Sequence, residues 1–243
     1  MQQERKDVEN AEIPVLCRSC EARHHGLCGA LSAEQLLELS RHTRMIHHTA
    51  GEELIGDNTE VRSYANVIRG VIKLTKTLED GRQQVVGLQF APDFLGRLYG
   101  QENQIAAEAA SFVDLCRVPK TALEALVKAS PALQHRLMQQ VLRELDEARS
   151  WMVTLGRKTA QEKVASFLYL IATHIDPTVD AAATGAASFD LPLNRVDIAD
   201  FLGITIETVS RQLTKLRQEG VIVITQNKHV DVPDLARLRR RCG

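Results

Sequence analysis

The spacing of hydrophobic and polar positions divides the chain into segments of different expected structure. Residues 1–30 follow neither the 3.6-residue period of a helix nor the two-residue period of a strand, so we expect a polar tail and then a loop rich in Cys, His and Gly. Ser32 has the character of a helix N-cap, and a short helix should follow it. Between about Met45 and Val118, glycine-containing turns separate short β-rich runs at 64–77, 84–90 and 110–118. This succession of short strands predicts a jelly-roll or barrel-like β domain.

A long helix should follow the β domain. It starts at Pro131 and continues to about Leu155, after a shorter helix over 121–129. Apolar side chains in the long helix recur in steps of three and four, the a and d pattern of a coiled coil; they are Met138, Val141, Leu145, Ala148, Met152 and Leu155. The alternative is that this seam packs on the helix's own domain. Glu144 and Arg149 fall at g and the following e position, where they can pair between parallel helices, and this favours a homodimer.

The last part of the chain has the pattern of a winged helix-turn-helix. The first helix covers 195–202 and is amphipathic, and its inward positions are Val196, Ile198, Ala199 and Leu202. Gly203 ends this helix, and Thr205 is a typical N-cap for a second helix over 206–219. The inward positions of the second helix are Ile206, Val209, Leu213 and Leu216. Two short strands, 221–225 and 229–232, should form the wing.

The outer face of the second helix carries side chains that can read DNA bases. Glu207, Ser210 and Arg211 stand at positions i, i+3 and i+4 and are therefore neighbours. Arg211 can donate two hydrogen bonds to a guanine, Glu207 can accept one from a cytosine amino group, and Ser210 can serve either base. Other side chains are better placed for phosphates, which position a protein on DNA; they are Thr208, Gln212, Lys215 and Arg217. The alternative is a surface ion pair between Glu207 and Arg211.

Composition and charge add limits to this picture. The chain has 243 residues, of which 44% are hydrophobic and 25% charged, as expected for a globular protein of two modest domains. No run approaches the roughly 20 apolar residues that cross a bilayer, and the first residues are polar, so we expect a cytoplasmic protein that binds no membrane. The formal net charge of −1 does not indicate nucleic-acid binding by itself. The arginines near the C-terminus are interpreted as a solvated face.

The cysteines indicate a metal site. A disulfide framework is not expected in a reducing compartment. Four thiols form a candidate ligand set, three of them close together in sequence: Cys17, Cys20, Cys28 and Cys116. Four thiolates are the normal complement of a 4Fe–4S cluster. A structural zinc ion, held by four cysteines or by three with His24 or His25, is the alternative. Cys242 lies outside the pattern and is interpreted as incidental.

The segment NRVDIADFLGITIETVSRQLTKLRQEG resembles the recognition segment of the CRP/FNR family of bacterial transcription regulators. The order of β domain, long helix and winged helix-turn-helix is similar to that family over nearly the whole chain. The ETVSR pattern resembles the FNR branch, in which the Glu, Ser and Arg read a TTGAT-type half-site; they correspond to Glu207, Ser210 and Arg211. The resemblance implies a homodimer on a palindromic site in double-stranded DNA, with half-sites about one helical turn apart.

The FNR branch also implies a sensor. It holds a 4Fe–4S cluster with three N-terminal cysteines and one central cysteine, and these correspond to Cys17, Cys20, Cys28 and Cys116. The gap between Cys20 and Cys28 is longer than in the usual spacing of the branch. An intact cluster would favour the dimer, and oxygen would degrade the cluster and remove that bias. A family member without a cluster, or with zinc in its place, is the alternative.

The cyclic-nucleotide branch of the family fits less well. That branch binds the cyclic phosphate with a glycine segment that contains a Glu, followed by an Arg with Ser or Thr. Here Asp93 and Gly96 keep the turn, but Arg97 stands where the Glu is expected, and no Arg-Ser or Arg-Thr precedes Ala109. Without that arginine the phosphate has no buried counter-charge, so we expect no cyclic nucleotide.

The sequence as a whole therefore predicts a transcription regulator and not an enzyme. We expect an α+β protein with a cysteine-rich segment (1–30), a jelly-roll domain like those that bind cyclic nucleotides (31–130), a dimerisation helix (131–156) and a winged helix-turn-helix domain (157–243). RNA polymerase is an expected partner, because the turn at 78–82 resembles the polymerase-facing loop of the family.

Overall fold

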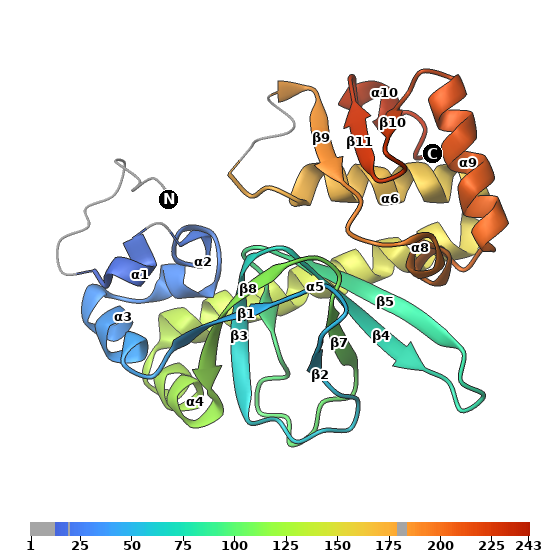
Figure 1. The fold of residues 1–243 in the computed structure, drawn as a ribbon. Coiled ribbons are helices and arrows are strands. Elements are labelled where there is room, and N and C mark those ends of the chain that lie inside the picture. The colour runs from blue at the N-terminus through green and yellow to red at the C-terminus, as the bar shows by residue number, and fades with distance from the viewer. Residues whose placement is uncertain (1–12, 19, 179–183) are drawn as a thin grey trace. The chain divides into compact units, whose positions relative to one another are not determined.

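The computed structural model describes residues 13–18, 20–178 and 184–243, and Figure 1 shows its elements along the chain. The chain divides into two compact units. The first contains residues up to Leu74 together with Leu88–Glu144, and the second contains Thr75–Gly87 and Leu145–Gly243. The long helix α5, Pro131–Arg157, begins in the first unit and ends in the second. The helices and antiparallel strand pairs confirm the predicted α+β class.

Two four-stranded sheets form the β domain in the described part of the chain. One has the order β1-β8-β3-β6, with bounds Arg44–His48, Val113–Pro119, Ser63–Arg69 and Phe94–Leu95. The other has the order β2-β7-β4-β5, with bounds Glu53–Ile55, Ala106–Ala109, Val71–Thr77 and Gln83–Phe90. The run expected at 64–77 is two strands, because the chain turns at Gly70 with a φ of 90°. A Cβ at Gly70 would lie 2.1 Å from the Phe112 carbonyl oxygen, so only glycine fits there.

Apolar clusters form the core of the described part of the first unit. One lies within the β domain and contains Val67, Ile72, Ala109, Val113 and Leu115. The other joins the helices around the β domain to the N-terminal segment, and it includes Leu27, Leu39, Leu123, Leu133 and Leu137. Helix α3, Ala33–Ser40, starts as predicted, with a capping box between Ser32 and Gln35. Helix α4, Lys120–Ala129, precedes α5.

The cysteine segment differs from the expected loop. Its described residues form three short helical turns: α1 (Val15–Arg18), α2 (Glu21–His24) and the 3₁₀ helix η1 (Leu27–Ala30). Each has only four residues, which is too short to produce a recognisable helical period. Burial supplies the stability that a four-residue helix lacks by itself, since Ala22 and Leu27 are almost fully enclosed.

The second unit contains the expected helix-turn-helix. Helix α8 spans Arg195–Leu202, Gly203 takes a left-handed conformation at its end, and α9 spans Ile206–Gln218 after the N-cap Thr205. Helix α6, Ala160–His174, packs against α8 and α9. The wing contains β10 (Val223–Thr225) and β11 (His229–Val232).

The second unit differs from the sequence interpretation in several details. Strand β9, Ala187–Asp190, was not among the predicted strands, and it pairs with β11. Val196 and Ile206, both expected to face inward, are exposed at 50% and 41%. Phe201 takes the inward place on α8 and stacks at 4.5 Å, centroid to centroid, on Trp151 of α5. The second unit ends in helix α10, Leu235–Arg239, which the sequence did not indicate.

Candidate functional site

Helix α9 presents the three predicted base-reading residues to solvent. Its buried face is Val209, Leu213 and Leu216, and the opposite face leaves Glu207, Ser210 and Arg211 exposed. The Thr205 hydroxyl accepts from the Thr208 backbone N–H at 3.3 Å, which fixes the start of the helix. The structure therefore brings these three residues together on one accessible helix face.

Local hydrogen bonds engage the charged side chains of this face. A backbone N–H bond in the first turn, followed by the Thr205 side chain, lowers the pKa of Glu207, whose carboxylate accepts both bonds. Arg211 Nη2 lies 3.4 Å from Thr208 Oγ1. The guanidinium is thus engaged within its own helix face rather than in the ion pair with Glu207 that was the alternative. Both side chains can exchange these weak partners for base edges.

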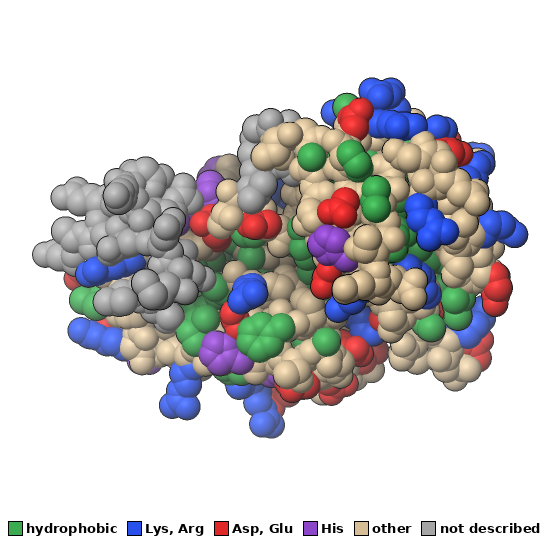
Figure 2. All heavy atoms as spheres, turned by 45° about the horizontal axis from the view of Figure 1, so that its top comes forward, with side chains coloured by type: hydrophobic (Ala, Val, Ile, Leu, Met, Phe, Trp, Pro, Cys, Tyr) green, Lys and Arg blue, Asp and Glu red, His purple; other side chains and the backbone are tan. Residues whose placement is uncertain are grey.

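The residues expected to contact phosphates differ in their solvent exposure. Lys215 is exposed, whereas Thr208 and Gln212 are half-buried. The side-chain oxygen of Gln212 is enclosed without a hydrogen-bond partner. Figure 2 shows Lys and Arg side chains gathered over the part of the second unit that carries α9 and α10. Positive charge at this end suits the DNA backbone.

The C-terminal arginines do more than form a solvated face. Arg237 on α10 donates through Nη2 to the Glu219 carbonyl oxygen at 2.5 Å and through Nη1 to that of Gly220 at 3.1 Å. Arg241 pairs with the Glu219 carboxylate at 3.0 Å. A cation at a helix C-terminus stabilises the helix dipole and its last carbonyl groups. These arginines therefore hold the end of α9, the predicted DNA-reading helix, a role that composition alone did not reveal.

The wing is held by a side-chain network around His229. Its Nδ1 lies 2.8 Å from Asp190 Oδ1, and its Nε2 lies 3.4 Å from Asp231 Oδ1. Ser188 donates to the same Asp231 oxygen at 2.7 Å. The Asp190 hydrogen bond is the main reason that the pKa of His229 is raised above its ordinary value. The turn between β10 and β11 has Gln226 and Asn227 at positive φ, and the Lys228 N–H donates to the Thr225 carbonyl oxygen at 3.2 Å.

The fold brings the four predicted cysteine ligands into one neighbourhood. Every pair among Cys17, Cys20, Cys28 and Cys116 lies within electrostatic range. Burial, followed by the charge of Cys20, raises the pKa of Cys17 to about 11. Burial likewise raises the pKa of Cys116 to about 12 and those of Cys20 and Cys28 above their ordinary value. Four thiolates here need a bound cation to offset their charge.

The sheet register explains how Cys116 joins the N-terminal cysteines. Cys116 lies on β8 between Met45 of β1 and Asn66 of β3. The Asn66 Nδ2 group donates to Cys28 Sγ at 3.7 Å, and its Oδ1 is buried without a hydrogen-bond partner. Asn66 thus connects the strand pair to the cysteine segment, although nothing in the sequence singled it out. An amide donor at a cysteine sulfur suits a metal-bound thiolate, because such bonds stabilise negative charge on sulfur.

The thiols are neighbours but not a formed coordination shell. Among the described residues, no three His, Cys, Asp or Glu side chains are grouped closely enough to hold a metal ion as they stand. The donor set fits a 4Fe–4S cluster in number and type, and ligation would draw the thiols closer together. Cys242 belongs to the second unit, where its thiol donates to the Leu238 carbonyl oxygen at 3.4 Å.

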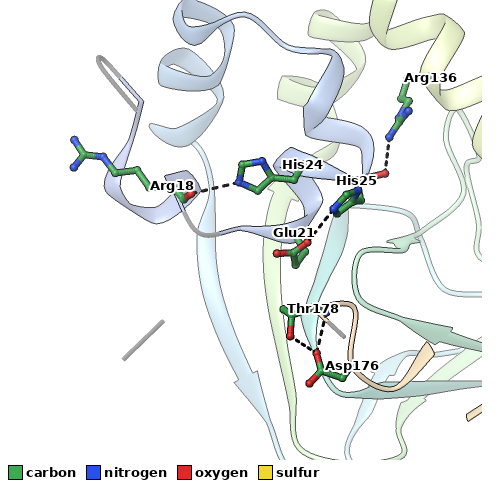
Figure 3. Close-up of polar contacts among 7 residues, drawn as sticks. All are labelled: Arg18, Glu21, His24, His25, Arg136, Asp176 and Thr178. Carbon is green, nitrogen blue, oxygen red and sulfur yellow. Dashed lines mark hydrogen bonds and ion pairs between the residues drawn. The ribbon is translucent and has the colours of Figure 1, made fainter. Parts of the chain in front are cut away.

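Both histidines of the cysteine segment have partners (Figure 3). His24 Nε2 lies 3.4 Å from the Arg18 carbonyl oxygen, and His25 Nε2 lies 3.5 Å from Glu21 Oε2. Arg136 of α5 donates to the carbonyl oxygens of His25 and Gly26. The segment is therefore held by backbone contacts as well as by its apolar side chains.

The expected dimer seam on α5 is largely open in the single chain. Met138, Val141, Leu145 and Met152 are exposed at 60%, 56%, 43% and 71%. Ala148 is also exposed, and Leu155 is half-buried. The opposite face of α5 is the one that packs inward, through Leu133 and Leu137. Glu144 and Arg149 lie near partners on their own helix, Gln140 at 3.3 Å and Asp146 at 3.3 Å.

The turn at 78–82 closes the β4–β5 hairpin. The Leu78 N–H donates to the Arg82 carbonyl oxygen at 2.8 Å, and Arg82 pairs with Asp80 at 2.8 Å. All of its residues are exposed. Within the described chain, none of the helices combines the length and apolarity needed to cross a membrane.

Comparisons with known proteins identify two family domains in the chain. Residues 45–130 match the cyclic nucleotide-binding domain, and residues 162–241 match the Crp-like helix-turn-helix domain. The chain is 53% identical to a probable transcriptional activator of Rhizobium leguminosarum bv. viciae, over 96% of this chain and 98% of that protein. It is 38% identical to the transcriptional activator protein FnrL of Cereibacter sphaeroides, over 96% and 95%. The structure of FixK2 from Bradyrhizobium japonicum matches with a TM-score of 0.73 and 29% identity, covering 83% of this chain and 98% of that one.

Proposed function

Because the chain belongs to the CRP/FNR family and is a DNA-binding transcription regulator of the FNR/FixK type, we propose that it senses oxygen through a 4Fe–4S cluster on Cys17, Cys20, Cys28 and Cys116. In this proposal the loaded protein is a homodimer that binds palindromic TTGAT-type sites through Glu207, Ser210 and Arg211. The chain is a regulator and not an enzyme.

The observation that carries the sensor proposal is the position of Cys116. It lies far along the sequence from the other three cysteines, yet the β1-β8-β3 register puts it opposite Asn66, which donates to Cys28. When bound, the cluster supplies an oxygen-sensitive link among the four thiolates. The chain itself supplies their burial and the amide donor at the Cys28 sulfur.

Zinc is less well supported as the occupant. A zinc site with one histidine would need a free ring nitrogen close to the thiols. The Nε2 atoms of His24 and His25 face a backbone carbonyl oxygen and the Glu21 carboxylate, so a histidine ligand would have to bind through its Nδ1 atom. A cyclic nucleotide is also not proposed, although residues 45–130 match that domain, because the sequence places Arg97 where the phosphate-binding segment needs a Glu.

The α5 seam supports the dimer. Its exposed apolar residues would gain burial only against another surface, and the a and d spacing favours a second copy of the same helix. Asp146 and Glu147 put like charges close to the expected symmetry axis, and Ala148 contributes little burial. The dimer is therefore expected to be only weakly stable. A small difference in free energy, supplied by the state of the cysteine segment, can then shift the equilibrium between monomer and dimer.

A spectrum recorded without oxygen tests the sensor. The full chain, purified anaerobically, should be brown, should contain about four iron and four sulfide per chain and should bleach in air. Cys116→Ser should lose the colour and the iron. Cys242→Ser is the matched control and should keep both, because its hydroxyl can still donate to Leu238. A colourless protein with stoichiometric zinc would overturn the proposal.

The hairpin turn at 78–82 is the proposed contact with RNA polymerase. Support comes from its exposure and from its resemblance to the polymerase-facing loop of the family. Asp80→Ala should lower transcription in a purified system while leaving DNA affinity unchanged. Equal transcription by the variant and the native chain would exclude this loop as the contact.

A further inference from the structure

Arg136 binds the backbone of the cysteine segment from the long helix (Figure 3). Its Nη2 donates to the His25 carbonyl oxygen at 2.5 Å, and its Nε donates to the Gly26 carbonyl oxygen at 3.2 Å. The guanidinium is planar and stays charged at any physiological pH, so two bonds to successive carbonyls fix the orientation of this backbone relative to α5. The bonded turn lies between the candidate ligands Cys20 and Cys28.

Apolar packing also holds the same turn against α5. Leu27 follows Gly26 directly and is only 2% exposed, and it packs in one cluster with Leu133 and Leu137. These two leucines flank Arg136 on α5, and Cys28 also packs against the cluster. Apolar contact has no preferred direction, so it allows the turn to slide. The two directed hydrogen bonds of Arg136 fix the position of the turn along α5.

The turn is also confined on its other side. A Cβ at Gly26 would lie 2.9 Å from Ala22 Cα and 2.9 Å from the Pro92 carbonyl oxygen, so the backbone approaches the β domain too closely for a side chain. The Gly26 carbonyl oxygen also accepts from the Gly29 N–H at 3.4 Å. A displacement of Cys20 or Cys28 therefore moves a backbone segment to which α5 is directly bonded.

We propose that Arg136 is the positioning residue that couples the cysteine segment to the dimer seam. The inference rests on the proposed function, because it takes the four cysteines as the sensor and α5 as the dimer contact. Met138, the first seam residue, lies two positions after Arg136. Through these two bonds, a cysteine segment that is fixed by its ligands holds this part of α5 more firmly than a segment that is free to move.

The chain offers a matched control on the same helix. Arg136 and Arg143 are seven residues apart, and both occupy the f position, farthest from the seam. Arg143 is exposed, so Arg143→Ala removes the same charge without touching the cysteine segment. Arg136→Lys keeps the charge but cannot place two parallel donors on neighbouring carbonyls.

The first measurement uses metal-free protein and needs no loaded cluster. Amide hydrogen exchange over residues 25–31 should be at least about tenfold faster in Arg136→Ala than in the native chain or Arg143→Ala, because the backbone loses its tie to α5. Unchanged exchange in Arg136→Ala would show that the bonds do not order the turn, and it would overturn the proposal.

The second measurement is the coupling itself. The dimer dissociation constant is measured by sedimentation before and after air bleaching, and the ratio of the two values gives the coupling. This ratio should fall at least about tenfold in Arg136→Ala, less in Arg136→Lys, and not in Arg143→Ala. Iron content should stay native in all three variants.

The outcomes separate this inference from the function it rests on. If the native chain holds no cluster, or its dimer does not respond to air, the proposed sensor fails and the coupling role fails with it. If the native chain responds and Arg136→Ala responds equally, only the coupling role is wrong. If Arg136→Ala takes up no cluster, Arg136 builds the cysteine site and does not serve as the link.

Discussion

At the scale of single residues, we expect the exposed face of α9 to determine which DNA sequence is bound. Arg211 can make the bidentate contact to guanine, and each such contact is worth ~1–3 kcal/mol of discrimination. Arg211→Ala should therefore weaken binding to a TTGAT-type site by about ten- to hundredfold and relax the preference for guanine. Fluorescence anisotropy at fixed salt, with native and base-substituted duplexes, measures both effects.

Lys215→Ala is the control for that change. An exposed lysine beside the base-reading face should contact phosphate, so its loss should weaken all sequences about equally and reduce the salt dependence of binding. If Arg211→Ala behaved in the same way as Lys215→Ala, Arg211 would be a phosphate contact and the assignment of base reading would be wrong.

Residue types and spacing predict this surface well. The caps that set α9, Thr205 before it and Gly203 at the end of α8, are local in sequence. Asn66, Arg136 and Arg237 could not be predicted in the same way. Arg136 acts on carbonyl oxygens more than a hundred residues away, and Arg237 acts on the end of a helix that precedes it. A side chain whose partner is created by the tertiary fold leaves no periodic signal in the sequence.

At the scale of elements, the wing should respond to pH through His229. Its raised pKa means that the folded state favours the protonated ring, paired with Asp190 and Asp231. The resulting stabilisation is fully present below the ordinary histidine pKa, and it is lost as pH rises through the higher folded value. The melting temperature of the native chain should therefore exceed that of His229→Gln at about pH 6, and the difference should vanish at about pH 9.

A histidine elsewhere in the same unit provides the control for this effect. His174 lies at the end of α6, outside the wing network. His174→Gln should follow the native pH profile, while Asp190→Asn should flatten it as His229→Gln does. A pH profile of His229→Gln that runs parallel to the native one would show that the wing is not stabilised by this charge.

The seam on α5 gives a second prediction at this scale. Leu145→Glu places a carboxylate at a central a position, where it would face its own copy across the expected symmetry axis. The dimer dissociation constant should rise at least tenfold, or ~1.4 kcal/mol, in sedimentation. The melting temperature should change little, because Leu145 is 43% exposed in the single chain. An unchanged dissociation constant would mean that the dimer uses another surface.

Helices and strands were predicted correctly where capping residues and glycines mark their ends in the sequence. They were predicted wrongly where contacts with distant parts of the chain determine the structure. Helix α8 has the predicted bounds because Gly203 ends it and Asn194 caps its start. Strand β9 was missed because it is defined by its pairing with β11, and that pairing leaves no local signal in the sequence. Val196 and Ile206 were placed inward by helical period alone, but the fold buries Phe201 and leaves both of them exposed.

At the scale of the whole molecule, we propose that the four cysteines of the first unit act on a seam along α5, the helix that begins in the first unit and ends in the second. The order of the elements could be predicted from the sequence, because each domain carries its own pattern. The meeting of Cys116 with the N-terminal cysteines could be predicted only from the family resemblance. Register between β1, β8 and β3 determines it, and register is a property of the folded sheet.

The most direct test of the central claim is DNA affinity measured on one anaerobic sample before and after a controlled exposure to air. Salt and protein concentration stay fixed, and iron content is followed in parallel, because both affinity and dimerisation depend on these conditions. We predict that affinity for a palindromic TTGAT-type duplex falls as iron is lost, with the protein passing from dimer to monomer. A protein that loses its iron yet remains a tight dimer at micromolar concentration with unchanged affinity would contradict the claim.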